Sequence, residues 1–259
     1  MDRPTRNIKL IVAYNGAAYH GWQRQADGID TVQLRVEQAA SAVCKHPVTV
    51  HGSGRTDAGV HAAGQVANFH TPNLTVPLSG LRRAMNSRLP ADIAIRSAAV
   101  VPDDFHASIS AIGKTYRYRI CVGPTRPVDR ARLVYHYWRP LELEPMIDAA
   151  ARLVGTHDFR SLASSQEQRE NTVRTITACD VSQIGDEIHV QVSGTGFLYH
   201  MVRNITGTLI EVGRGRWSPE HIGPMLASLD RKQAGPTAPP DGLSLIRVHY
   251  RPEDIAPPA

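Results

Sequence analysis

The chain has 259 residues, a length that suits either one large domain or two smaller ones. Hydrophobic residues make up 42% of it and charged residues 20%, which excludes a wholly disordered chain, a coiled coil and a collagen-like repeat. The formal net charge is +5, with 25 arginines against only 4 lysines, and this fits a nucleic-acid partner as well as it fits a host whose codons favour arginine.

Hydrophobic periodicity in the first half of the chain predicts the element order β-α-β-β-α-β-β. Apolar residues alternate over 7–14, which is typical of a strand, and they recur at helical spacing after Thr31, which we expect to be the N-cap of a helix ending near His46. A glycine-rich turn over 52–59 follows. The other predicted elements are strands over 48–51, 65–70, 93–101 and 115–122, and a helix over 78–89 that Pro90 ends.

Prolines between 124 and 145 interrupt this pattern, so we expect two subdomains, residues 1–123 and 124–259. The second half predicts helices over 146–154, over 197–212 and after Ser218, and strands over 173–184, 187–192 and 242–250. Both halves contain pieces of a split β-α-β motif. The predicted fold class is therefore α+β, with two ferredoxin-like (RRM-like) subdomains and a mixed, mainly antiparallel sheet.

Two further features concern location and redox chemistry. Every apolar stretch is far shorter than the roughly 18 residues of a membrane-spanning helix, so we expect a cytoplasmic protein with no membrane partner.

The three cysteines, Cys44, Cys121 and Cys179, are odd in number, widely spaced and without a C-x-x-C pair. We expect them to be small buried hydrophobic residues.

The densest group of chemically active residue types is the segment 52–61, GSGRTDAGVH. Its glycines allow close approach of a ligand, so the turn could present the carboxylate of Asp57 to a bulky partner. The common alternative is an aspartate whose side chain only accepts hydrogen bonds from the backbone of its own turn. His51, Asp57 and His61 lie close in sequence, but there is no H-x-x-x-H pair and the turn is unsuited to a helix, so no metal site is expected.

The segment 114–119, KTYRYR, alternates basic and aromatic residues. On a strand, this alternation places Tyr116 and Tyr118 on one face and the arginines on the other. Aromatic side chains on strands stack on nucleic-acid bases, whereas an ordinary amphipathic strand packs the same tyrosines into the core.

The segment 197–204, FLYHMVRN, carries a single arginine, Arg203, in a mainly apolar helix start. A half-buried arginine needs an anionic partner, for which Asp57 is the candidate. The alternative is an arginine on the solvent face of the helix.

Taken together, GRTDAGVH at 54–61, KTYRY at 114–118 and HMVRN at 200–204 closely resemble the three signature segments of the tRNA pseudouridine synthase A family, in the same order and spacing. Supporting similarity includes YHGWQRQ at 19–25 and VPDDFHA at 101–107. The resemblance implies the pseudouridine synthase fold with an active-site cleft between the subdomains. It also implies isomerisation of uridine to pseudouridine at positions 38–40 of the tRNA anticodon stem-loop, by a homodimer, without cofactor or metal.

The resemblance implies a role for each of four residues. Asp57 matches the catalytic aspartate, which attacks C1′ or C6 or acts as a base at the sugar. Arg203 matches the arginine that pairs with this aspartate. Tyr116 matches the tyrosine that stacks on the target uracil, and Arg55 matches the residue linked to base flipping.

Asn15, Tyr199 and Ser108 stand where the family usually or sometimes has aspartate, histidine and arginine, which leaves details of tRNA docking open. Two other classes of protein remain compatible with the residues. A catalytically silent RNA-binding module would not need Asp57. A glycoside or nucleoside hydrolase would use Asp57 as nucleophile but would need a second carboxylate, and the matching segments offer no obvious one.

Overall fold

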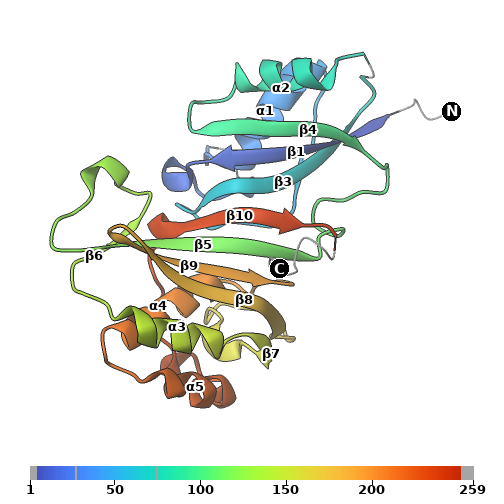
Figure 1. Ribbon diagram of the computed structural model, residues 1–259. Coiled ribbons are helices and arrows are strands. Elements are labelled where there is room, and N and C mark those ends of the chain that lie inside the picture. Colours follow the sequence, from blue (N-terminus) through green and yellow to red (C-terminus); the bar gives the residue numbers. More distant parts are fainter. Residues whose placement is uncertain (1–4, 27, 74, 252–259) are drawn as a thin grey trace. The chain divides into compact units, whose positions relative to one another are not determined.

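The computed structural model describes residues 5–26, 28–73 and 75–251, which form two compact units (Figure 1). The first unit takes in the described residues up to Ala111 and then Leu245–Tyr250, and the second takes in Ile112–Ser244. The first unit therefore ends before the expected boundary at residue 123, because strand β5 (Gly113–Val122) pairs along its length with β9 (Glu187–Gly194) of the second. It also takes its last strand from near the end of the chain.

The first unit is a sheet with two helices. Its strand order is β4 (Ile93–Val101), β1 (Arg6–Tyr14), β3 (His61–Thr71) and β10 (Leu243–His249), with the short β2 (His51–Gly52) paired to β3. Strand β1 is antiparallel to both its neighbours. Helix α1 (Val32–Cys44) is capped by Thr31 as predicted, and α2 (Leu78–Asn86) packs on β4.

Residues 48–50 are not the strand that the sequence predicts, since β2 begins only at His51. The backbone N–H of Val48 donates to Ser41 Oγ at 2.9 Å, and that of Val50 donates to Glu37 Oε1 at 3.0 Å. Side chains of α1 thus take the hydrogen bonds that a neighbouring strand would otherwise accept, while both valines remain buried.

The second unit is a sheet in the order β5, β9, β8 (Val173–Ile184) and β7 (Gly155–Asp158). These strands are antiparallel to their neighbours, whereas β6 (Tyr135–Tyr137) is parallel to β5. Helix α3 (Leu143–Ala151) packs on β8 and α4 (Met201–Gly213), α4 contacts β5, and α5 (Ile222–Ser228) follows. The α+β class with a mixed, mainly antiparallel sheet is confirmed, although no pattern in the sequence predicted the short strands β6 and β7.

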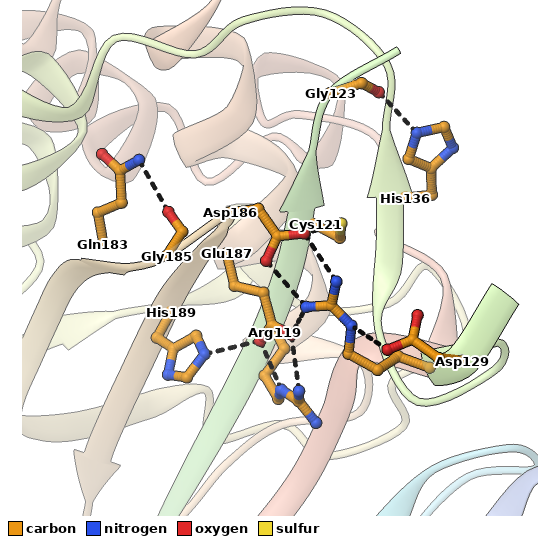
Figure 2. A network of polar contacts seen from close by, with 11 residues as sticks. Arg119, Cys121, Gly123, Asp129, His136, Gln183, Gly185, Asp186, Glu187 and His189 are labelled. Carbon is orange, nitrogen blue, oxygen red and sulfur yellow. Dashed lines mark hydrogen bonds and ion pairs between the residues drawn. The ribbon is translucent and has the colours of Figure 1, made fainter. Parts of the chain in front are cut away.

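A buried ionic network fastens the segment between β5 and β6 to the β5–β9 pair (Figure 2). The carboxylate of Glu187, only 5% exposed, accepts two 2.7 Å hydrogen bonds from Arg119, one of 2.6 Å from Arg130 and one from His189. Arg130 also binds Asp186. Burial by itself raises the pKa of Glu187, but the three donors outweigh it and lower that pKa to about 2.

Candidate active site

The Asp57 turn joins β2 to β3 and is held by buried hydrogen bonds on the N-terminal side of the carboxylate. Thr56 Oγ1 and the Tyr14 hydroxyl share a buried hydrogen bond of 2.8 Å, and the Thr56 carbonyl accepts from the backbone N–H of Trp22 at 3.1 Å. Burial raises the pKa of Tyr14 well above its usual value, so the phenol stays neutral and keeps this bond. The backbone that carries Asp57 is therefore fixed from β1 and from the 16–22 loop.

The turn also needs two glycines that lie outside it. Gly21 has φ +87°, and a Cβ there would overlap the carbonyl oxygen of Thr56. A Cβ on Gly16 would overlap the carbonyl oxygen of Val60, and the Gly16 N–H donates to His61 Nδ1 at 3.0 Å. The buried His61 thus positions the loop that packs under the turn.

The start of the turn is anchored by Gln65, a fully buried residue of β3. Ser53 Oγ donates to Gln65 Oε1 at 2.6 Å, and Gln65 Nε2 donates to the Gly54 carbonyl at 2.9 Å. The sequence analysis missed Gln65 and Tyr14 as supports of the site. For Gln65, the only signal is a polar residue inside an otherwise apolar strand pattern.

On this fixed turn, the side chain of Arg55 is exposed and that of Asp57 is half-buried. The backbone N–H of Val60 donates to the Asp57 carbonyl at 3.1 Å, which closes the turn behind the carboxylate. The first unit thus brings Arg55 and Asp57 together, two residues apart on one rigid loop.

In the second unit, Tyr116 and Tyr118 lie on β5 opposite Val192 and Val190 of β9. The Tyr116 ring meets the Phe197 ring edge-on, with centroids 5.1 Å apart, and keeps 8% of its surface exposed. Tyr118 is fully buried. Both tyrosines are therefore buried, Tyr118 completely and Tyr116 all but 8% of its surface.

Arg203 lies on α4 and is half-buried. Its Nε donates to the Ala238 carbonyl at 2.7 Å, and the Ala238 N–H donates back to the Arg203 carbonyl at 3.2 Å. The Tyr118 hydroxyl donates to the next carbonyl, that of Pro239, at 2.7 Å. The segment around Ala238 thus links Arg203 to the strand that carries Tyr116.

Helix α4 begins at Met201 and not at residue 197 as predicted. His200 has φ 61°, a left-handed conformation that cannot continue a helix. The backbone N–H of Tyr199 donates to the carboxylate of Glu167 at 2.8 Å, which holds the preceding turn open. Because Glu167 is far away in sequence, the apolar pattern alone could not show where the helix starts.

Two of the three departures from the family pattern have a local explanation. The Asn15 side-chain oxygen accepts from the Ala17 N–H at 3.1 Å, as an aspartate would, so the cap of this short 3-10 turn is kept. Ser108 is exposed and forms hydrogen bonds through its backbone: its N–H donates to His106 Nδ1, and its carbonyl accepts from the Ala111 N–H. The Tyr199 ring lies 3.9 Å from that of His200, and nothing in the structure explains the change from histidine.

Across the described ranges, no three His, Cys, Asp or Glu side chains gather in a way that could hold a metal ion. Within the same ranges, no helix is both long and apolar enough to span a membrane.

Cys44, Cys121 and Cys179 are buried, as predicted, and burial raises the pKa of the Cys179 thiol to about 12.

The sequence profile described as tRNA pseudouridine synthase matches residues 10–108 and 149–251. The "tRNA pseudouridine synthase A" of Syntrophotalea carbinolica is 47% identical over 95% of this chain and 97% of its own length. The "tRNA pseudouridine synthase A 2" of Clostridium perfringens is 44% identical over 95% and 100%. The chain belongs to the tRNA pseudouridine synthase family.

Pseudouridine synthases are isomerases, so membership of the tRNA pseudouridine synthase family makes this chain an enzyme of that class. The matched stretch 10–108 includes Arg55 and Asp57, and 149–251 includes Arg203, while Tyr116 lies between the two. The family's sequence similarity thus extends through both compact units.

Proposed function

We propose that this protein isomerises uridine to pseudouridine in tRNA, at positions 38–40 of the anticodon stem-loop. The observation that carries the proposal is the family match through both units, which takes in the rigid glycine-rich turn bearing Asp57. The positions within tRNA rest on the resemblance of the signature segments alone. The proposal includes a cytoplasmic homodimer that works without cofactor or metal.

In this reaction, the bond between C1′ and N1 of the uridine breaks, the uracil turns, and C5 bonds to C1′. The C5 proton leaves to solvent and N1 takes up a proton, so the product is an isomer of the substrate and no co-reactant is consumed. An ionised Asp57 carboxylate would act on the electron-poor sugar or on C6, as nucleophile or as base. The half-buried setting of Asp57 keeps part of the surrounding water away from this chemistry.

The other residues position the base. We propose that the uracil stacks on Tyr116, whose ring is held by Phe197, and that Arg203 pairs with Asp57. Arg55, exposed on the turn, would fill the space that the flipped uridine leaves in the stem.

Tritium release from tRNA labelled at C5 of uridine tests the proposal, because only chemistry at C5 removes the label. We expect stoichiometric release from tRNA with uridine at positions 38–40 and none when those uridines are replaced by cytidine. Free uracil among the products would indicate a hydrolase instead. Tight binding of tRNA without release of label would indicate a silent RNA-binding module.

Arg55→Ala is expected to slow modification of a paired uridine in the stem more than that of an unpaired one in the loop. Extrusion from a pair costs a few kcal/mol that an inserted guanidinium partly offsets, so we expect a loss of roughly tenfold or more in the stem only. Single-turnover rates on stem-loops with one target uridine each would measure this. Arg83→Ala, on exposed α2, is the matched control, and equal losses at both positions would exclude the flipping role.

Arg203→Ala is expected to lower the single-turnover rate, because the proposed ion pair with Asp57 would be lost. Arg203→Lys should restore part of the rate because it restores the positive charge. A rate for Arg203→Ala equal to that of the wild type would argue against the pairing with Asp57.

A further inference from the structure

The ring of Phe197 lies between Tyr116 and a glycine. Its centroid is 5.1 Å from that of Tyr116, and the two rings are nearly perpendicular at 83°. The tip of the Phe197 ring, Cζ, is 3.4 Å from the point where a Cβ on Gly194 would lie. Gly194 has no side chain with which to hold the ring there. The position of the ring against Tyr116 therefore depends on how the backbone around Phe197 is held.

The loop before β8 binds the backbone of the turn that carries Phe197. The backbone N–H of Ser164 donates to the Tyr199 carbonyl at 2.9 Å, and the Tyr199 N–H donates to the Glu167 carboxylate at 2.8 Å. Arg169 Nη1 donates to the Phe197 carbonyl at 3.3 Å. One short loop thus binds both backbone groups of Tyr199 and the carbonyl of Phe197.

Glu167 connects two of these contacts through its side chain, which is 8% exposed. Besides the hydrogen bond from Tyr199, its carboxylate accepts bonds of 2.9 and 2.8 Å from the Arg169 guanidinium. The same guanidinium reaches the Phe197 carbonyl, so the carboxylate holds both ends of the contact with the turn. The hydrogen bond from Arg169 is the main cause that lowers the pKa of Glu167 to about 2, and Glu167 is therefore ionised at neutral pH.

The backbone just after Tyr199 needs such support. His200 has φ 61°, and a residue with a Cβ keeps this left-handed conformation only where the surrounding contacts fix it. The hydrogen bonds from Ser164 and to Glu167 act on the residue directly before it. Loss of the carboxylate would therefore free the turn at its least favourable point, three residues from Phe197.

We propose that Glu167 is a positioning residue for the reaction: by holding the backbone of the turn, it fixes the Phe197 ring against Tyr116. This rests on the proposed function, in which the uracil stacks on Tyr116. Glu167 acts through Tyr199 and Arg169 and not on the RNA itself. A displaced Phe197 ring would leave the stacking tyrosine less well placed, which slows the chemical step more than it weakens the binding of RNA.

The first readout is independent of activity and uses Glu167→Gln, which removes the charge and keeps the shape. The chain has four phenylalanines, so protein labelled with 4-fluorophenylalanine gives four fluorine-19 NMR signals, and Phe197→Leu identifies the one from Phe197. We expect Glu167→Gln to shift or broaden this signal and to leave those of Phe69 and Phe105, in the first unit, in place. An unmoved Phe197 signal would overturn the proposal.

Glu187→Gln is the matched control, because it removes the same charge from an arginine-bound carboxylate of the same unit (Figure 2). The Glu187 side chain is 5% exposed, and its pKa is also lowered to about 2. Glu187 lies opposite Cys121 in the β5–β9 ladder, whereas Tyr116 lies opposite Val192, so about 17 Å of strand separates the two positions. This variant should leave the Phe197 signal where it is in the wild type.

The second readout is the single-turnover rate of tritium release beside the affinity for tRNA. We expect Glu167→Gln to lower the rate roughly 10- to 100-fold while the Kd changes less than about threefold, and Glu187→Gln to change neither. In a Phe197→Leu background, Glu167→Gln should cost less than about twofold, because both changes act through the same ring. An unchanged rate in Glu167→Gln, or losses that multiply independently, would exclude the positioning role. A wild type that releases no label would overturn the proposed function, and the NMR signal would then decide alone whether Glu167 holds Phe197.

Discussion

Asp57→Asn is expected to abolish pseudouridine formation, with a loss of more than about 10³-fold in single-turnover rate. Asparagine has nearly the same shape, and the turn is held through backbone atoms, Thr56 and Gln65, none of which the substitution changes. The fold and the affinity for tRNA should therefore survive while the negative charge is lost. Tritium release and tRNA binding, measured on the same preparation, separate the two effects.

Asp104→Asn is the control for this experiment, because Asp104 is an exposed aspartate in the same unit. It makes the same chemical change, and its release rate should equal that of the wild type. A release rate for Asp57→Asn within tenfold of the wild type would show that the ionised carboxylate is not required, and the assignment of Asp57 would have to be abandoned.

Gly207→Ala is expected to destabilise the second unit by about 3 kcal/mol, a large effect for the addition of one methyl group. Helix α4 meets the 235–238 segment backbone to backbone at this residue. A Cβ on Gly207 would overlap the carbonyl oxygen of Pro236, and one on Gly235 would lie 2.5 Å from the carbonyl carbon of Gly207. Urea denaturation followed by circular dichroism would measure the loss as a lower midpoint.

Gly223→Ala provides the comparison, because Gly223 is also helical and a Cβ there would have no atom within 4 Å. We expect it to be neutral or to stabilise by up to about 1 kcal/mol through helix propensity. Equal midpoints for the two variants would show that the close approach at Gly207 has no energetic importance. A lowered midpoint in Gly207→Ala alone would show that this close approach contributes to the stability of the second unit.

The residues that we propose to carry the chemistry could be found in the sequence because their types are unusual where they stand. Asp57 lies among glycines, Tyr116 alternates with basic residues, and Arg203 interrupts an apolar run. Their supports could not be found in the same way. Gln65 and Glu167 act through hydrogen bonds to residues outside their own local segment. For Gln65 the only local signal is a polar residue inside an apolar strand pattern, and nothing local distinguishes Glu167 from a surface polar residue.

The helices and strands were also predicted well where the local pattern decides the structure, and less well where a distant residue does. Long periodic segments such as β1, α1, β8 and β10 lie where the sequence predicts them, since local pattern and burial agree there. The differences arise where a long-range partner decides the backbone. Ser41 and Glu37 take the hydrogen bonds of residues 48–50, and Glu167 delays the start of α4.

The position of β10 has a consequence for synthesis on the ribosome. Strand β3 is complete by Thr71, but Leu245–Tyr250, the strand beside it in the first unit, is made roughly 170 residues later. At roughly 5–20 residues per second, the edge of β3 is left without this neighbour for on the order of ten seconds or more. The second unit has all of its strands earlier, so the half of the protein that is made first is the half that finishes folding last.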